Sequence, residues 1–358
     1  MTTNNVCVIG GVDTHSVTHH AAVLHAGTGQ LLGDHGFPAT QAGYRQLLAW
    51  MAGFGRVERV GVEGTGSYGS GLARHLAGNG VTVVEVDRPN RRARRASGKS
   101  DPLDAIAAAR AVLAEVATGT PKTRDGVVEA IRMLLTTRDG AVTARTAAIN
   151  QLHALVVTAP TQLREQWAGM SQADLVDVCA RLRPDAERRA DPVQAAKTAA
   201  RRLALRIRDL TIEICDADRD LDDLTARHAP NTRAAFGVGP IVAAQMLVTA
   251  GDNIDRLHSE AALARLTGVA PIPASSGNTS KHRLHRGGDR AANKAIYFIV
   301  RTRLRHDQRS KDYLARRLAE NKTARDVFRC LKRAVVRELY RTLRADLEHL
   351  TNPVKTAV

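Results

Sequence analysis

The sequence predicts an α/β domain followed by an all-α remainder. Within residues 1–122, short apolar runs typical of strands alternate with amphipathic segments, whereas beyond them apolar residues recur mostly at helical spacing. Hydrophobic residues make up 44% and charged residues 25% of the 358 residues, which is ordinary for a globular protein. A chain of this length is expected to bury a sizeable core and to form two or three domains.

The first 122 residues are expected to form a mixed sheet covered by helices. Strands are predicted over residues 6–13, 19–26, 31–37, 59–64 and 81–87. One helix begins after Thr40, a second ends before Gly80, and a third spans "SDPLDAIAAARAVLAEV" at residues 100–116. The order β-β-β-α-β-α-β-α, with parallel crossovers after the hairpins, is that of ribonuclease-H-like nuclease domains.

Residues 123–228 are expected to form a helical coiled-coil region. Apolar residues line one seam over residues 128–156, which Arg138 and Arg145 interrupt, and a cleaner heptad pattern follows over residues 203–224. Two such helices can pair within one chain or between two chains. The Arg-rich segment between them, around "TQLREQW" and "RLRPDAERRADP", is broken by prolines, and no chemistry is assigned to it.

The C-terminal region, residues 229–350, is expected to be helical. "FGVGPIVAAQMLVTAGD" resembles a helix-hairpin-helix, whose Gly-x-Gly turn can offer backbone N–H groups to a phosphate or can serve tight packing alone. "NKTARDVFRCLKRAVVRELYRTLR" is predicted to form a long amphipathic helix with a basic outer side, and residues 351–358 are expected to be a frayed tail.

The charge balance predicts a polyanionic partner. Lys and Arg number 52 against 36 Asp and Glu, a net charge of +16, and nucleic acid is the first candidate. Aromatic residues are only 3% of the chain, which argues against broad base-stacking platforms. Four scattered cysteines lack metal-site spacing, and neither a signal peptide nor a membrane-length apolar run is found. We therefore expect reduced thiols and a cytoplasmic location.

Four carboxylates stand at informative positions of the first domain. Asp13 ends the first strand, Glu63 ends the fourth, and Asp101 and Asp104 open the helix after the fifth. Carboxylate oxygens suit Mg²⁺, and four converging acids could hold two ions about 4 Å apart for phosphodiester cleavage. The alternatives are a turn role for Asp13 and a helix start with Asp101 as N-cap, Pro102 at N1 and Asp104 at N3.

Basic and small polar segments accompany these acids. "DRPNRRARRASGK", at residues 87–99, includes Arg92 and Arg95 and is either a solvated charge run or a phosphate-backbone contact. "ASSGNTS", at residues 274–280, has the composition of a linker, yet it lies between an apolar run and the basic "KHRLHRGGDR".

Several motifs together resemble one family. "GVDTH", "VEGTGSYG" and "KSDPLDA" are similar to the three acidic motifs of the DEDD-type insertion-sequence transposases. "FGVGPIVAAQMLVTAGD", "LTGVAPIPASSG" and "HRGGDRAANKAIY" resemble the second conserved region of that family, in the same order. The resemblance implies a RuvC-like nuclease domain, a coiled coil that dimerises, and a C-terminal transposase domain with a catalytic serine.

The resemblance also implies roles for individual residues. Asp13, Glu63, Asp101 and Asp104 fall on the Mg²⁺-binding positions, and Ser276 falls on the nucleophile, although Ser275 is adjacent and motif register alone selects Ser276. In this family a structured non-coding RNA bridges donor and target DNA by base pairing. The enzyme then excises and inserts the element through a covalent phosphoserine intermediate.

These inferences predict a composite site, with metal-binding acids from the first domain and the serine from the last, contributed by different subunits of a dimer or tetramer. Lys281, Arg283, Arg286 and Arg290 are expected to hold the scissile phosphate, or to make general backbone contacts only. Two rival interpretations remain: a junction-resolvase-like metal-dependent nuclease that uses water, and a non-enzymatic basic nucleic-acid-binding protein.

Overall fold

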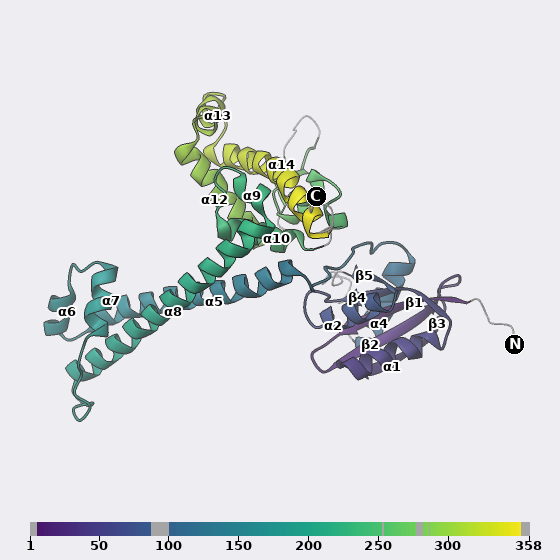
Figure 1. Cartoon of the computed structure of the whole chain (residues 1–358), viewed down its shortest axis with the longest axis horizontal. Helices are drawn as coiled ribbons and strands as arrows, with labels where there is room; N and C mark the ends of the chain where they lie inside the picture. The colour runs from purple at the N-terminus through teal and green to yellow at the C-terminus, as the bar shows by residue number, and fades with distance from the viewer. Residues whose placement is uncertain (1–5, 87–99, 253, 277–281, 286, 352–358) are drawn as a thin grey trace, which may run out of the picture. The chain divides into compact units, whose positions relative to one another are not determined.

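The computed structural model describes residues 6–86, 100–252, 254–276, 282–285 and 287–351 (Figure 1). The chain divides into two compact units. One comprises Met1–Gly126 with Ala250–His258, and the other comprises Val127–Thr249 with Ser259–Val358. Among the described residues, no helix combines the length and apolar character needed to cross a membrane.

The first unit is built on a five-stranded mixed sheet. Its elements are β1 (Cys7–Thr14), β2 (Thr18–His25), β3 (Leu31–Pro38), α1 (Gln41–Ala52), β4 (Arg56–Glu63), α2 (Ser70–Gly78), β5 (Thr82–Val86), α4 (Asp101–Leu113) and a 3-10 turn (Ile254–Leu257). The strand order is β3-β2-β1-β4-β5, in which β1 is antiparallel to β2 and parallel to β4. This confirms the predicted mixed sheet and its element order.

The two faces of the sheet bury different helices. Because successive side chains of a strand point to opposite faces, Val8 and Val12 share one face of β1 and Ile9 lies on the other. Val8 and Val12 join the core formed with α1 and α2, whereas Ile9 packs with Ala108 and Val112 of α4. The face that carries Ile9 is therefore the face covered by α4.

Two glycines allow α4 to approach this face closely. A Cβ atom at Gly11 would lie 2.2 Å from the backbone nitrogen of Ala109 and 2.3 Å from the carbonyl oxygen of Ala105. A Cβ atom at Gly61 of β4 would lie 2.7 Å from a methyl carbon of Val112. Only residues without a side chain fit here, so the glycines of "IGGVD" and "VGVEG" set the distance between helix and sheet.

The observed N-cap of α1 is the predicted residue, whereas that of α4 is not the residue considered from the sequence. Thr40 caps α1 as predicted, since its hydroxyl oxygen accepts a hydrogen bond from the backbone nitrogen of Gly43 at 3.1 Å. The alternative that made Asp101 the N-cap of α4 is wrong. Ser100 holds that position with an extended backbone and makes no side-chain cap hydrogen bond, so Asp101 and Asp104 both lie in the first helical turn.

The second unit is almost entirely helical. Its helices are α5 (Val127–Thr158), α6 (Thr161–Trp167), α7 (Gln172–Ala180), α8 (Pro192–His228), α9 (Pro230–Ala234), α10 (Pro240–Ala250), α11 (Glu260–Leu266), α12 (Arg290–His306), α13 (Gln308–Ala319) and α14 (Ala324–Thr351). A short antiparallel hairpin, β6 (Pro271–Pro273) and β7 (His282–Leu284), was not anticipated from the sequence.

The long helices α5 and α8 pack antiparallel within one chain (Figure 1). Arg138 Nε donates to Asp218 Oδ1 at 2.6 Å, and Arg145 contacts the hydroxyl of Thr211 at 3.5 Å. The two arginines that interrupt the predicted seam therefore reach across to the partner helix. Pairing between chains remains a prediction.

The buried seam of α5 also shifts by one residue from the predicted one. Ala141 and Ala148 are buried, whereas the predicted Val142 and Ile149 are only partly buried. A one-residue step turns the buried side by about 100°, which is much more than the roughly 20° per heptad that separates a straight helix from an ideal 3.5 repeat. The packing of α8, and not the helix repeat, therefore sets this seam. The small alanines bring α8 close to α5 at these positions.

The last helix, α14, extends beyond the predicted basic segment, which ended at Arg344. The carboxylate of Asp346 is 1% exposed and accepts hydrogen bonds from the backbone nitrogens of Asn231 and Thr232 at 3.0 and 2.8 Å. Asp346 thereby satisfies the free N–H groups at the start of α9, which is a common role for an acid at a helix N-terminus.

We predict that Gly11→Ala lowers the free energy of unfolding by about 1–3 kcal/mol, the usual range for overpacking a core. The added methyl group meets the backbone of α4 and forces the helix away from the sheet. Urea denaturation measures the effect. Gly78→Ala is the matched control, because a Cβ there meets nothing within 4 Å. Equal stabilities of the two variants would contradict the proposed close approach.

Candidate metal centre and serine hairpin

The parallel pairing of β1 and β4 brings two of the predicted acids to one edge of the sheet. Val12 pairs with Val62, so Asp13 and Glu63 follow at neighbouring strand ends. The hydroxyl of Thr14 donates to the backbone carbonyl oxygen of Glu63 at 2.8 Å and ties the two ends together. Asp13 and Glu63 lie two residues after Gly11 and Gly61, and strand alternation therefore places them on the α4 face.

The first turn of α4 supplies the other two acids. Asp104 is buried and Asp101 is half-exposed. Burial raises the pKa of the Asp13 carboxyl above its ordinary value. The positive charge of His15 lowers that pKa, and the negative charges of Asp104 and Asp101 raise it further. The net effect is a raised pKa of Asp13, for which burial is the largest cause.

A histidine that the sequence analysis did not select completes the cluster. His15 Nε2 lies 3.2 Å from Asp13 Oδ2 and 3.3 Å from Asp101 Oδ1. One ligand atom from each of these three residues lies within 4.8 Å of the others. The available signal was the spacing in "GVDTH", since residues two apart on an extended backbone project to the same side.

These residues fit a divalent cation. Asp and His side chains offer oxygen and nitrogen ligands. A shared cation would offset the negative charge of the neighbouring carboxylates. Asp13 is 6% exposed and Glu63 is 5% exposed, so the protein holds two carboxylates with little access to water. Burying a carboxylate costs free energy unless metal ions, charged groups or hydrogen-bond donors compensate it.

Ser276 lies three residues after β6, on the hairpin of the second unit. Ser275 and Ser276 are both exposed. β6 pairs with β7 in the register Ile272 to Arg283. Of the predicted basic contacts, Arg283 on β7 and Arg290 at the start of α12 are exposed. Lys281, Arg286, Arg92 and Arg95 lie outside the described residues.

A close glycine contact anchors the base of this hairpin. A Cβ atom at Gly288 would lie 2.4 Å from the backbone nitrogen of Gly268, so the "HRGGD" and "LTG" segments touch backbone to backbone. Asp289 then caps α12 through the backbone nitrogen of Ala291 at 2.8 Å and accepts a hydrogen bond from the hydroxyl of Thr249 at 2.7 Å. The residues just before β6 and just after β7 are therefore held in place by these contacts.

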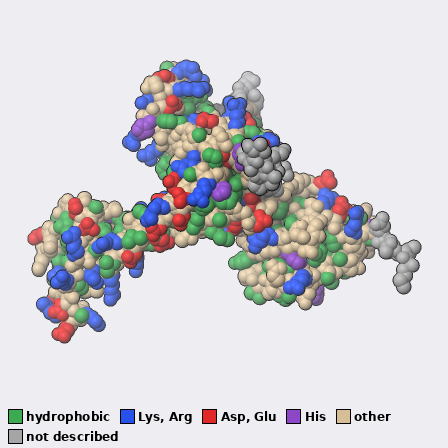
Figure 2. All heavy atoms as spheres, viewed as in Figure 1, with side chains coloured by type: hydrophobic (Ala, Val, Ile, Leu, Met, Phe, Trp, Pro, Cys, Tyr) green, Lys and Arg blue, Asp and Glu red, His purple; other side chains and the backbone are tan. Residues whose placement is uncertain are grey.

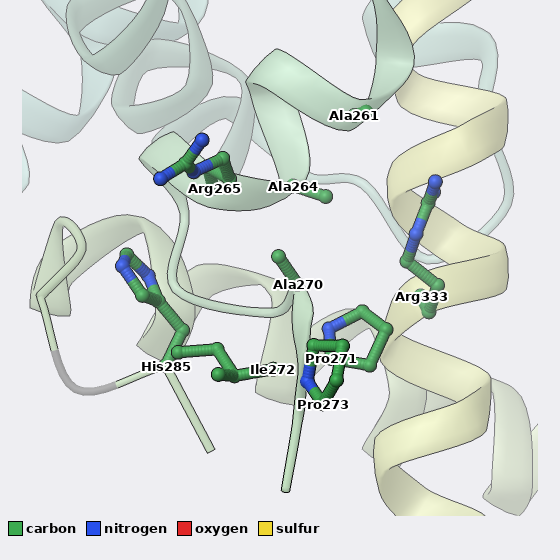
Figure 3. Close-up of a pocket in the computed structure, with 9 residues that line it drawn as sticks. All are labelled: Ala261, Ala264, Arg265, Ala270, Pro271, Ile272, Pro273, His285 and Arg333. Carbon is green, nitrogen blue, oxygen red and sulfur yellow. The ribbon is translucent and has the colours of Figure 1, made fainter. Parts of the chain in front are cut away.

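A cavity of about 510 Å³ lies beside β6 (Figure 3). Its walls are Ala261, Ala264, Arg265, Ala270, Pro271, Ile272, Pro273, His285 and Arg333. Two buried nitrogens, His285 Nδ1 and one terminal nitrogen of Arg333, have no hydrogen-bond partner among the described residues. Neither arginine was predicted from the sequence: Arg333 lies on α14, distant in sequence from Ser276, and Arg265 lies at the end of α11, just before the "LTGVAPIPASSG" motif.

The basic excess is concentrated on particular elements of the second unit (Figure 2). The first half of α8 exposes Arg201, Arg202, Arg206 and Arg208, and the helices α12 and α13 expose Arg301, Arg305, Arg309, Lys311 and Arg316. In contrast, the second half of α8 exposes Glu213, Asp216, Asp220, Asp222 and Asp223. A polyanion therefore meets attractive and repulsive surfaces on one helix.

Comparisons with known proteins give matches in both units. Residues 10–159 match a family model described as a transposase, and residues 232–315 match one described as the IS116/IS110/IS902 transposase family. The first match includes the four acids and His15, and the second includes Ser276.

Two curated relatives come from bacterial insertion elements. The 42 kDa protein of insertion element IS900 from Mycobacterium paratuberculosis is 30% identical over 154 residues, which cover 42% of this chain and 39% of the relative. The 43.6 kDa protein of insertion element IS110 from Streptomyces coelicolor is 36% identical over 110 residues, which cover 30% of this chain and 27% of the relative. The matched segments thus span well under half the length of these relatives.

We predict that Asp13→Asn stabilises the metal-free protein and abolishes its stabilisation by divalent cations. The carboxylate of Asp13 has a raised pKa, so its ionised form opposes folding at neutral pH, and a neutral amide removes that opposition. Thermal unfolding with and without Mg²⁺ or Mn²⁺ measures both effects. Asp34→Asn is the control and should keep the metal response, because the carboxylate of Asp34, on β3, pairs with His20 of β2. An unchanged metal response in Asp13→Asn would rule out this site.

Proposed function

Because this chain belongs to the family of DEDD-type insertion-sequence transposases, we propose that it cleaves and rejoins DNA strands to move an insertion sequence. The observation that carries the proposal is the gathering of acids at the edge of the sheet, where β1, β4 and α4 meet. Asp13 and Glu63 end adjacent strands, and Asp101 and Asp104 occupy the first turn of the helix above them.

We assign Asp13, Glu63, Asp101 and Asp104 to the binding of Mg²⁺, as two ions. The bound ions would lower the pKa of an attacking hydroxyl and stabilise the charge on the leaving oxygen. The protein's own contribution is to hold the carboxylates in place before the substrate arrives. The packing of α4 against Gly11 and Gly61 and the hydrogen bond from Thr14 provide this rigidity.

We assign the nucleophile to Ser276. Its hydroxyl oxygen attacks the scissile phosphorus and gives its proton to a base, while the bond from phosphorus to the leaving deoxyribose oxygen breaks and that oxygen takes up a proton. The product is a phosphoserine ester together with a free strand end. Attack by a second strand's hydroxyl then releases the serine and restores a phosphodiester, so the two steps together exchange strands without an external energy source.

Basic groups around the serine hairpin support this assignment. Arg283 on β7 and Arg290 at the start of α12 are exposed, and Arg265, Arg333 and His285 line the cavity beside β6. Guanidinium groups bind phosphate oxygens through paired, charge-assisted hydrogen bonds. We propose that these arginines hold the phosphates that flank the cleaved bond.

We assign the roles of the domains, the oligomeric state and the partners by analogy with the family. Residues 1–122 form the metal-dependent nuclease domain, residues 123–228 the dimerisation region, and residues 229–350 the serine-containing domain. The protein acts in the bacterial cytoplasm as a dimer or tetramer on donor and target DNA, guided by a structured non-coding RNA. The exposed basic halves of α8 and α12–α13 are suitable surfaces for these polyanions.

We predict that Ser276→Ala eliminates a covalent protein–DNA adduct that the native chain forms with guide RNA, cognate DNA and Mg²⁺. Adducts are resolved by denaturing electrophoresis of labelled DNA. Ser275→Ala is the matched control and should retain the adduct, because both serines are exposed and adjacent. An adduct that persists in Ser276→Ala excludes this nucleophile. Cleavage without any adduct supports a water-using nuclease instead.

We predict that Glu63→Gln lowers strand cleavage by at least about 100-fold, a typical loss when one group that stabilises transition-state charge is removed. DNA binding should change little, since the side chain of Glu63 is buried. Cleavage and gel-shift assays on the same preparation separate the two effects. Glu58→Gln, on the same strand but before its C-terminal edge, is the control. If Glu63→Gln cleaves normally, the proposed metal centre is wrong.

A further inference from the structure

We propose that His15 is a nitrogen ligand of the metal centre and shifts its preference from Mg²⁺ toward transition-metal ions such as Mn²⁺. This inference rests on the proposed metal centre and adds a ligand that the four-acid assignment lacks. It follows from the position of one atom, His15 Nε2, between two carboxylates that come from different elements.

The backbone fixes the direction of the imidazole. Asp13 and His15 are two residues apart, so both project to the same side, whereas Thr14 between them points away and bonds to the Glu63 carbonyl. The backbone nitrogen of His15 donates to the carbonyl oxygen of Thr18 at 3.1 Å and closes the turn into β2. The ring is thus held at the cluster by the strand end and by the turn.

The distances also fit a shared cation. Nε2 is within hydrogen-bond reach of Asp101 Oδ1 at 3.3 Å, and it lies at a nearly equal distance, 3.2 Å, from Asp13 Oδ2. Neighbouring ligands of an octahedral ion with bonds of about 2.1 Å lie roughly 3 Å apart. The observed separations are within a few tenths of an ångström of that value.

The exposure of the three side chains allows a metal ion to reach the site from water. The side chain of His15 is 43% exposed and that of Asp101 is 50% exposed, whereas the Asp13 side chain is 8% exposed. The buried carboxylate forms the floor of the site, and the two exposed ligands form its rim. An ion can therefore enter from water and keep several water ligands, as small divalent ions require.

The neighbouring histidines do not have this arrangement. His20 pairs with Asp13 across the two strands, but its Nε2 lies 2.7 Å from Asp34 Oδ1. His19 is buried and stacks on Tyr44, at the opposite face of the sheet. His20 is therefore a matched control, because it lies on β2 beside the cluster and has a carboxylate partner of its own.

A nitrogen ligand has a chemical consequence. Mg²⁺ strongly favours oxygen ligands, whereas imidazole binds first-row transition metals well. His15 should therefore strengthen the binding of Mn²⁺ more than that of Mg²⁺. If the ligands were carboxylates alone, removing one of them would lower the affinities for Mn²⁺ and Mg²⁺ by more similar factors.

The test uses the full chain without nucleic acid and Mn²⁺ as the probe. Electron spin echo envelope modulation detects nitrogen bonded to Mn²⁺, and titration calorimetry measures the affinity. We expect a directly bonded nitrogen in the native chain and in His20→Gln, and none in His15→Gln. The Mn²⁺ affinity of His15→Gln should fall about tenfold or more, since even outer-shell partners of metal ligands account for 10- to 100-fold.

Each outcome has a distinct meaning. Nitrogen coupling that persists in His15→Gln, or Mn²⁺ binding in the native chain that lacks nitrogen coupling but is lost in Asp13→Asn, overturns the role of His15. In the second case the proposed metal centre stands. If Asp13→Asn binds Mn²⁺ as well as the native chain, the metal centre itself is wrong and the role of His15 fails with it. Unchanged thermal unfolding of metal-free His15→Gln shows that the variant is folded.

Discussion

The close approach of α4 to the sheet is the constraint on which the proposed metal centre depends. Two of its acids belong to strand ends and two belong to the first turn of α4, so the helix position sets the distance between the pairs. That position is possible because Gly11 and Gly61 present no side chain to the helix. These two glycines serve packing, yet they lie two residues before Asp13 and Glu63 and act on their geometry.

The same packing creates an electrostatic cost. Holding Asp13 in a buried place beside Asp101 and Asp104 raises its pKa, which means that the ionised form opposes folding. The hydrophobic cores on both faces of the sheet stabilise the fold and offset the unfavourable free energy of burying this carboxylate. A site that is destabilising when empty becomes favourable when a cation binds, because binding to the folded state alone adds stability.

Patterns with a local cause were predicted well from the sequence, and features set by tertiary contacts were not. The order of strands and helices along the first domain followed from apolar runs, and the Thr40 cap followed from a short-range rule. The α5 seam shifted to Ala141 and Ala148 because the packing of α8 decides which side of a helix is buried. The hairpin around Ser276 was missed, since proline at Pro271 and Pro273 argues against a strand unless it is short and at an edge. His15 was missed because its importance comes from Asp101, which is distant in sequence.

Charge placement restricts how a polyanion can use the second unit. From Lys197 to Asp216 the axis of α8 covers about 28 Å at 1.5 Å per residue. Electrostatic screening at physiological ionic strength acts over about 8 Å, so charges at the two ends of this span act almost independently, whereas Arg208 and Glu213, about 7.5 Å apart along the axis, still interact. A nucleic acid along the basic half is attracted there, and the attraction weakens where the strand reaches the acidic half. The net charge of +16 describes the whole chain and does not show where a nucleic acid is attracted. Along α8 that attraction depends on the order of basic and acidic residues.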